Sequence, residues 1–371
     1  MKRTLVKYRN SKFRKLTRKY EKYLPILFFI GGFIFDTLTL GRIDRLYDLI
    51  VLCLHMSFLS LTIFLYNLAE DGRWKNTFLE RIEEYFPLAI QFFFGGLSSA
   101  YVIYFSRSVS LSKTAAFFVM LIVLLLANEH LKRRISNKYL QFSVYFFLSF
   151  TFFTFMIPVF IKEMSTQVFI YSGLASLGCT LAMIIFIYSI SPSTRLEIRL
   201  PRLFAVVLGI YVIINGFYFL KLIPPVPLAL EEGIVAHNIK QVNNDYIVSY
   251  ESDDSFIFWR DHKLKFNFTS EERVYVFSSI FAPTDLKESM LHRWSWYNDT
   301  TNEWSVVEDI PFDITGGRDG GFRGYTYKEN VRPGIWQVEV LTDDELLLGV
   351  IDFEIVMDNN LDNSRIVDKK F

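Results

Sequence analysis

The sequence has 371 residues, of which 51% are hydrophobic and 17% aromatic, including 38 Phe. This apolar content exceeds that of an ordinary soluble protein, so a purely soluble globule is excluded. The net charge of +1 hides two unlike parts. Residues 1–22 carry ten Lys and Arg against one acid, net +9, whereas residues 228–371 carry 14 against 27, net −13. The acidic part argues against nucleic-acid binding.

Seven apolar segments are each about 20 residues long, the length that a helix needs to cross about 30 Å of hydrocarbon. We predict seven transmembrane helices over residues 22–223, after a basic cytoplasmic N-terminus over residues 1–21. A cleaved signal peptide is the alternative for the first segment, but Asp36 interrupts it and no small-residue cleavage site follows before Arg42. The predicted spans are Lys22–Leu40, Tyr47–Leu68, Tyr85–Ser106, Thr114–Leu131, Leu140–Ile161, Val168–Ile190 and Leu203–Ile223.

Lys and Arg are unevenly shared between the two sides of these spans, with 20 on the side of the N-terminus and five on the other. Because positively charged flanks stay in the cytoplasm, the N-terminus is predicted to be cytoplasmic. An odd number of spans then places the C-terminal part outside. The basic N-terminus either fixes this topology alone or also binds membrane lipids.

Ionisable residues inside membrane spans are costly and are functional candidates by default. Asp36, Asp48 and Lys221 lie near the outer ends of their predicted helices, and His55 shares a helix face with Asp48. We predict an ionic cluster from these four residues. It is either purely structural or a coupling point between the helices and the C-terminal part. His55 is a hydrogen-bonded structural histidine or, alternatively, a member of a proton relay.

Small residues four positions apart allow helices to approach closely. They occur at Gly96 and Ala100 and again at Gly178 and Ala182. We expect them to pack the bundle internally or, alternatively, to form a homo-oligomer seam. The spans contain no HExxH motif, no string of carboxylates and no matching pair of Gly/Pro-broken helices, which weakens the protease and proton-driven transporter hypotheses.

The segment IPPVPLAL at 223–230 follows the last span, and its prolines forbid continuation of the helix. We assign residues 224–230 as a proline-rich junction. Beyond it, short β-branched and aromatic runs such as YIVSY at 246–250, FIFW at 256–259 and RVYVFSSIFA at 273–282 alternate with turn residues. About eight such runs predict an all-β domain, an immunoglobulin-like β-sandwich, over residues 231–357, with a polar tail over 358–371.

Residues 292–356 contain the elements HRW, ITGGRDGGFRGYTYK and RPGIWQVEV. This stretch resembles the bacterial family called domain of unknown function 2914, in which such a C-terminal module can follow several membrane spans. The resemblance covers residues 223–356 well and the spans only loosely. It implies a bacterial cytoplasmic-membrane protein and brings no activity with it.

The glycine-rich segment GGRDGGFRG at 316–324 lacks the Gly-Lys-Ser/Thr ending of a phosphate loop and leads into a predicted strand. Its glycines are expected to supply a turn or bulge, with the arginines held by nearby acids or carbonyls. The alternative is a ligand site in which Arg318 and Arg323, with Asp319 beside them, bind an anionic glycan or a phosphate headgroup.

Period two in MLHRWSWY places His292, Trp294 and Trp296 on one strand face. We expect this face to pack in the core. The alternative is an exposed aromatic platform for sugar rings that also includes Trp304. The histidines have no metal-site spacing, and the two cysteines, Cys53 and Cys179, lie in apolar segments, so no metal or cofactor is predicted.

Together these features predict a non-enzymatic membrane protein that presents an acidic β-sandwich outside the cytoplasm. The predicted partner of the β-sandwich is another protein or an envelope glycan. A transporter or flippase with a β lid is one alternative. A membrane enzyme acting on lipid-linked substrates is another.

Overall fold

The computed structural model describes residues 46–108, 119–123, 137–161, 163, 165–223, 228–242, 245–252, 265–268, 273–281, 288–314, 322–357 and 366–371. The chain divides into two compact units. The first comprises Met1–Ile103, Val119–Phe152 and Leu174–Val212. The second comprises Tyr104–Phe118, Phe153–Gly173 and Ile213–Phe371, so it contains the β strands together with the helix ends that precede them in the chain.

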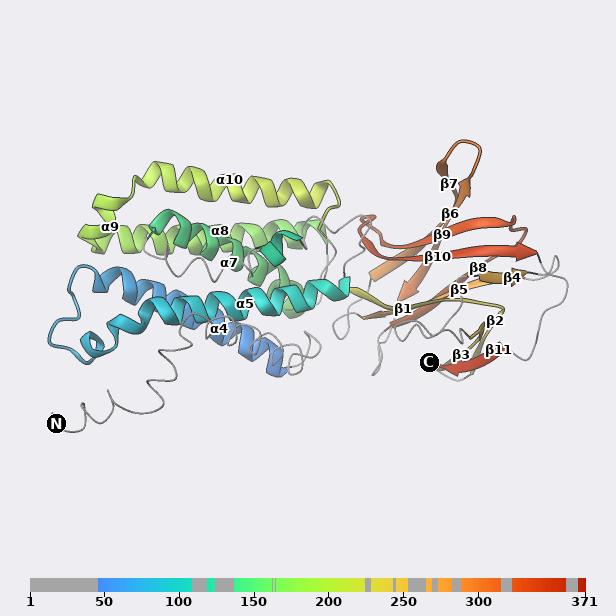
Figure 1. Ribbon diagram of the computed structural model, residues 1–371, viewed down its shortest axis with the longest axis horizontal. Coiled ribbons are helices and arrows are strands. Elements are labelled where there is room, and N and C mark those ends of the chain that lie inside the picture. The colour runs from blue at the N-terminus through green and yellow to red at the C-terminus, as the bar shows by residue number, and fades with distance from the viewer. Residues whose placement is uncertain are drawn as a thin grey trace, which may run out of the picture. The chain divides into compact units, whose positions relative to one another are not determined.

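Among the described residues, five helices are long and apolar enough to cross a membrane. They correspond to the second, third, fifth, sixth and seventh predicted spans. The first predicted span lies outside the described residues. So does the fourth, except for helical residues 119–123. The count of seven spans therefore stays a prediction. The five helices are α4 (Leu46–Ala69), α5 (Phe86–Ser108), α7 (Lys138–Ile161), α8 (Thr166–Ile190) and α10 (Leu200–Phe219) (Figure 1).

Short helices occupy the connections at one end of these spans. Two 3-10 turns, η1 (Phe78–Arg81) and η2 (Glu83–Tyr85), lie between α4 and α5. Helix α9 (Pro192–Glu197) lies between α8 and α10, and Ser191 caps it by accepting a hydrogen bond from the Thr194 N–H. Proline at the first helical position suits this start, because its missing N–H would have no helical partner there.

The β strands form three sheets among the described residues, with the orders β1-β5-β8, β4-β10-β9-β6-β7 and β11-β3-β2. All pairings are antiparallel except β10 with β4. The strands are β1 (Ala229–Ala236), β2 (Asn238–Val242), β3 (Asp245–Glu251), β4 (Lys265–Phe268), β5 (Val274–Phe281), β6 (Glu288–Asn298), β7 (Glu303–Ile314), β8 (Phe322–Lys328), β9 (Gly334–Thr342), β10 (Leu347–Met357) and β11 (Ile366–Lys370).

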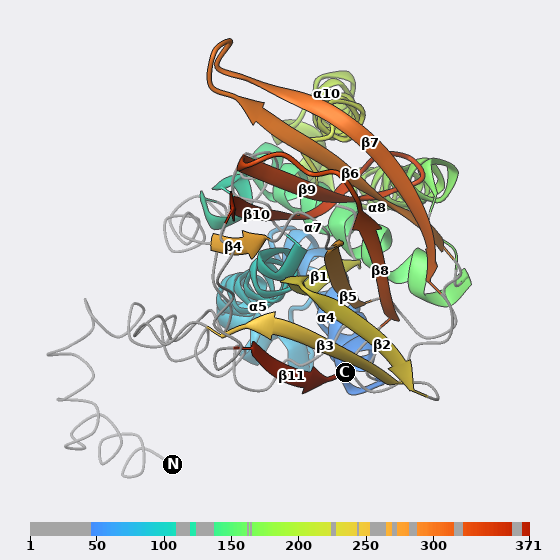
Figure 2. The ribbon, with the colours of Figure 1, turned by 90° about the vertical axis from the view of Figure 1, so that its right-hand side faces the viewer.

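The first two sheets share one apolar core, to which Phe322 contributes from β8 and Trp294 and Phe353 from the five-stranded sheet. Side chains alternate between the faces of a strand, so the apolar face of one sheet can pack on the apolar face of another and make a sandwich. Val276 of β5 enters this core, whereas its neighbour Phe277 enters a second cluster with strands β2 and β3. Figure 2 shows β2, β3 and β11 as a layer of their own.

The structure confirms a helical N-terminal part and a C-terminal β domain, while the immunoglobulin-like assignment stays a prediction. The sequence did not predict β1, β2, β7 or β11. Strand β11 lies in the segment predicted as a polar tail. It pairs with β3, and Phe371 packs on Phe277 with ring centroids 4.6 Å apart, so this end belongs to the β domain. The predicted run 256–259 lies outside the described residues.

Two glycines within residues 292–356, Gly324 and Gly334, are required by the local packing or backbone conformation. A Cβ at Gly324 would lie 2.4 Å from the Phe312 ring, so only glycine lets β7 and β8 approach there. Gly334 adopts a φ of +120°, which side chains of L residues rarely tolerate, and a Cβ there would lie 3.1 Å from the Trp296 indole nitrogen.

Candidate functional site

A buried polar group joins the two sheets of the sandwich. His292 of β6 is fully buried, with Nε2 2.7 Å from the Ser278 hydroxyl on β5 and Nδ1 2.8 Å from the Thr326 hydroxyl on β8. The indole N–H of Trp294 also donates to the Thr326 oxygen at 3.1 Å. Four side chains from three strands thus satisfy one another's hydrogen bonds inside the core.

This arrangement favours the neutral form of His292. The hydrogen bonds are satisfied when the Thr326 hydroxyl donates to Nδ1 and the Nε2–H donates to Ser278. Burial lowers the pKa of His292 from 6.5 to about 3, because no water solvates a charged ring there. The Ser278–His292 pair is closed off from solvent and therefore cannot reach a substrate, despite its resemblance to a nucleophile and base.

Arg293 points to the opposite face of the same strand and forms an ionic network. Its Nε and Nη2 donate to the two carboxylate oxygens of Asp309 on β7, both at 2.9 Å. Its Nη2 also donates to Glu345 at 3.3 Å. The Arg293 guanidinium lowers the pKa of the Asp309 carboxyl. The HRW element therefore places one side chain between the sheets, one on the outer face and one in the core.

The turn between β9 and β10, residues 342–345, contacts the ends of two apolar helices within the second unit. Its Asp344 carboxylate accepts hydrogen bonds from the N–H of Thr166 at 3.0 Å and from its hydroxyl at 2.7 Å. Thr166 is the first residue of α8, where the helix dipole favours a negative charge. The Tyr218 hydroxyl of α10 lies 3.1 Å from the Thr166 hydroxyl.

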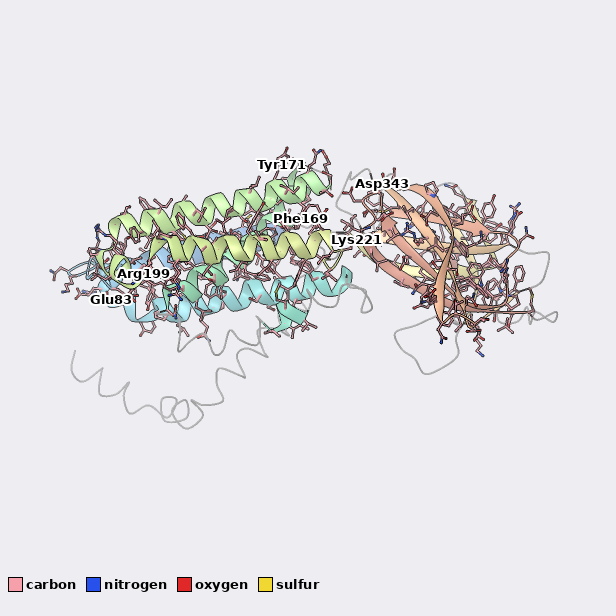
Figure 3. All side chains as sticks on the ribbon, turned by 90° about the horizontal axis from the view of Figure 1, so that it is seen from above. Glu83, Phe169, Tyr171, Arg199, Lys221 and Asp343 are labelled. Atoms are coloured by element: carbon pink, nitrogen blue, oxygen red, sulfur yellow. The ribbon has the colours of Figure 1, made fainter. Side chains whose placement is uncertain are left out.

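Lys221 and Glu345 form an ion pair at 2.5 Å beside this contact. Lys221 ends α10 with hydrogen bonds from its N–H to Tyr218 and from the next N–H to Phe217, which define a Schellman ending. Lys221 and Glu345 both adopt left-handed backbone conformations, with φ of 58° and 55°. Figure 3 labels Lys221 at the end of α10 and Asp343 in the turn between β9 and β10. We call residues 342–345 with Thr166, Tyr218 and Lys221 the turn contact.

Strand β7 is the last strand of the five-stranded sheet, and the β6–β7 hairpin extends beyond its neighbours (Figure 2). Trp304, Val306 and Val307 of β7 are all exposed. Tyr297 of β6 packs edge-on against Trp304, with ring centroids 5.2 Å apart. We call these four residues the edge patch.

A second polar cluster, which the sequence analysis missed, surrounds Lys138 at the start of α7. The Lys138 side chain is fully buried, with its ammonium 2.8 Å from Glu70, 3.4 Å from Glu197 and 2.9 Å from the Thr194 hydroxyl. Asp71 accepts a hydrogen bond from the Ser193 N–H at 2.8 Å. We call this group, from the turn after α4, the start of α7 and helix α9, the Lys138 cluster.

Buried polar groups next to the Lys138 cluster lack some hydrogen bonds among the described residues. The side-chain nitrogen of Asn67 donates to the side-chain oxygen of Gln141 at 3.0 Å. The other amide atoms, Asn67 Oδ1 and Gln141 Nε2, have no hydrogen-bond partner among the described residues, and Asp71 Oδ2 also has none there. Such groups are costly to bury without a partner. Ser191 also donates to the Asn67 carbonyl, so the cluster continues into the cap of α9.

The predicted aromatic residues occupy three different environments. Trp294 is fully buried in the sandwich core, so a sugar platform that includes it is wrong. Trp296 packs against the same core, and its N–H donates to the Pro333 carbonyl at 3.3 Å. Trp304 is exposed in the edge patch.

The predicted arginine site is only partly described. Arg318 and Asp319 lie outside the described residues. Arg323 lies on β8 and is partly buried, and its Nε has no hydrogen-bond partner among the described residues. The anion-binding hypothesis for this segment therefore stays a prediction.

The predicted membrane cluster is described at three positions. Asp48 is buried on α4. The Nδ1–H of His55 donates a 2.8 Å hydrogen bond to the Val51 carbonyl, and the His55 ring contacts Phe92 and Phe93. Asp36 lies outside the described residues. Because Lys221 pairs with Glu345 of the β domain, the structure gives this lysine a partner that the sequence analysis did not name.

The small residues of the spans also differ in their surroundings. A Cβ at Gly96 would lie 3.0 Å from the His55 ring, so Gly96 allows α4 and α5 to pack closely, and Ala100 is buried on the same helix. Gly178 and Ala182 are exposed on α8. An oligomer seam through Gly178 and Ala182 stays a prediction.

The fold and these contacts define a class of protein with apolar, span-length helices followed by a β domain. The predicted resemblance is confirmed for that domain, because residues 287–355 match the family described as "Protein of unknown function (DUF2914)". The matched residues include the HRW element, the edge patch and the turn at residues 342–345. No curated protein matches the chain.

Solved structures similar to the chain have low identities and low TM-scores. An immunoglobulin-like protein from Pseudomonas aeruginosa is 9% identical over 35% of this chain and 98% of its own, with a TM-score of 0.22. A β-glucosidase from Listeria innocua is 12% identical over 30% of this chain and 16% of its own, with a TM-score of 0.18. A DNA glycosylase from Pseudomonas fluorescens is 9% identical over 85% of this chain and 100% of its own, with a TM-score of 0.20. Such scores carry no argument about function.

Proposed function

We propose that this chain is a non-enzymatic, multi-pass protein of a bacterial cytoplasmic membrane whose β domain binds a partner protein outside the cytoplasm. The apolar helices anchor the domain, and the turn contact holds it to the helix ends. The observation that carries the proposal is the exposed edge patch on the β6–β7 hairpin. Contiguous exposed apolar side chains are typical of interaction sites.

The interior of the β domain supports a binding role over a catalytic one. The best candidate for nucleophilic chemistry, Ser278 with His292, is buried and lies between two sheets. A catalytic pair must lie within hydrogen-bond reach of its substrate. The pair instead satisfies its own polar atoms and joins the sheets.

The turn contact supports attachment of the domain to the ends of α8 and α10 that belong to the same compact unit. Asp344 bonds to the start of α8, and Glu345 pairs with Lys221 directly after α10. These contacts join sites more than a hundred residues apart in sequence, so they restrict the domain beyond what the proline-rich junction alone would do.

In-cell photocrosslinking tests the partner-binding function. A photoreactive phenylalanine analogue is placed singly at exposed β-domain positions in the full chain, namely Val242, Trp304, Ile335 and Val367. The proposal expects a discrete protein adduct from at least one position, with none from the buried position Trp294. Absence of an adduct from every exposed position would contradict the proposal.

A transport function is a second candidate, and the Lys138 cluster favours it. Buried ionisable groups near apolar helices mark ion and proton pathways in many transporters. The test uses liposomes that contain the full chain and a pH-sensitive dye, with a potassium gradient and valinomycin as driving force. Proton entry that Lys138→Met abolishes favours transport. A dye response equal to that of protein-free liposomes rejects proton transport.

A further inference from the structure

We infer that the outer edge of β7 binds an extended, basic segment of a partner protein, which adds a strand to the five-stranded sheet. This inference rests on the proposed partner-binding function and specifies the chemistry of the partner. Its first basis is strand order. Strand β7 ends the order β4-β10-β9-β6-β7, so one side of its backbone faces away from the sheet described here. An added strand would supply main-chain hydrogen bonds on that side.

The second basis is the distribution of exposed apolar side chains. Across the described β domain, the exposed large hydrophobic residues are Val242, Trp304, Val306, Val307, Tyr327, Ile335, Met357 and Val367. Three of these eight lie within four positions of β7, with exposed fractions of 42%, 60% and 45% for Trp304, Val306 and Val307. Tyr297 pairs with Trp304 across the strands, so their rings share one face.

The geometry of β7 limits the length of the added strand. In the β6–β7 pair, Ser295 lies opposite Val306, and the preceding residue of β6, Trp294, lies opposite Glu308. Val307 therefore has no partner on β6 and is the extra residue of a β-bulge. Pro311 cannot donate a backbone hydrogen bond. An added strand therefore pairs with the segment that begins at Glu303 and ends before Pro311.

Charge selects a basic partner over a second copy of this chain. Residues 228–371 carry 14 Lys and Arg against 27 acids, net −13, so the field of the domain attracts a cationic segment and repels another acidic domain. Within β7, Glu308 and Asp309 are acidic but pair with Lys328 and Arg293. The apolar side chains of the edge patch can then contact the apolar residues of the added strand, which alternate with its basic residues.

The test measures peptide binding to the full-length protein in detergent micelles by fluorescence anisotropy. The probe is a ten-residue peptide of alternating Val and Lys. One comparison peptide replaces Lys with Glu. Another keeps the Val/Lys sequence but carries N-methyl groups on alternate residues, so its charge is unchanged and its β pairing is blocked.

We expect saturable binding of the Val/Lys peptide that weakens at least about tenfold in Val306→Lys and with N-methylation. The matched control is Val242→Lys, which adds the same charge to an exposed valine on β2, another edge strand, and should leave binding unchanged. Equal loss in both variants, equal binding of the Glu peptide, or no saturable binding overturns the inference. So does a doubled molecular mass that Val306→Lys abolishes, because a second copy would then occupy the edge.

The two proposals fail in distinguishable ways. A protein adduct at Ile335 or Val367, together with a peptide titration that Val306→Lys does not change, overturns the β7 inference and leaves the partner-binding function standing. Absence of adducts at every exposed position overturns both. Thermal unfolding of Val306→Lys and Val242→Lys in the same detergent verifies that both variants are folded.

Discussion

Acidification should destabilise the β domain through His292. The native pKa is about 3, because the ring is fully buried, whereas the ordinary value for an exposed histidine is 6.5. Between these values the unfolded chain binds one proton more than the native chain. The stability that the neutral ring contributes is therefore fully present above pH 6.5 and is lost as the pH falls towards 3.

The magnitude follows from the same linkage. Each pH unit below 6.5 costs about 1.4 kcal/mol of unfolding free energy, so a change from pH 7 to pH 5 costs about 2 kcal/mol. Burial explains the direction, because the core holds no water to solvate a charged ring.

Urea unfolding of the full-length protein in detergent measures this loss. Five of the six tryptophans lie in the C-terminal part, so tryptophan fluorescence reports mainly on the β domain. The control is His292→Gln, which removes the titrating ring and keeps every other acid and base. The wild type should lose about 2 kcal/mol more than His292→Gln between pH 7 and pH 5. Equal pH dependence of the two proteins would refute the reasoning.

Three further predictions concern packing and charge. Gly324→Ala places a Cβ 2.4 Å from the Phe312 ring, so the urea assay should show a loss of about 1–3 kcal/mol, and an unchanged midpoint would contradict this. Lys138→Ala removes a fully buried side chain whose ammonium pairs with the partly exposed Glu70 and Glu197 carboxylates, so thermal unfolding should show a loss of about 1–3 kcal/mol, and a negligible loss would contradict this. Lys221→Ala and Glu345→Ala should each cost less than about 1 kcal/mol, because both side chains are half exposed, and the double variant should cost less than their sum. Strict additivity would show that the ion pair contributes nothing.

The sequence predicts elements well where one local pattern dominates. Long apolar runs identified the five span-length helices among the described residues, and alternation in MLHRWSWY placed His292 and Trp294 on one buried face. Strand β7 escaped prediction because EWSVVEDIPFDI contains four acids and a proline, which are typical of an edge strand and obscure the strand pattern. Strand β1 similarly carries Glu231 and Glu232.

The polar clusters were harder to predict because they depend on contacts between distant parts of the sequence. Lys138 counted only as one of the charges that fix topology, yet Glu70 lies 68 positions before it and Glu197 lies 59 after it. The predicted topology does place these three residues at the cytoplasmic helix ends, and that shared level is the signal that could have found them. Lys221 was predicted to join other span residues, but its partner Glu345 lies in a turn of the β domain.

Accessibility of single cysteines in intact cells tests the central claim, that the β domain lies outside the cytoplasm, most directly. Val306→Cys in the edge patch and Leu196→Cys on α9 are each made in a chain with Cys53 and Cys179 replaced by Ala. Both positions are exposed, so each should react with a maleimide that can reach it. A maleimide that cannot cross the cytoplasmic membrane should label Val306→Cys in intact cells and Leu196→Cys only after lysis. Labelling of Leu196→Cys in intact cells, with Val306→Cys protected until lysis, would contradict the account.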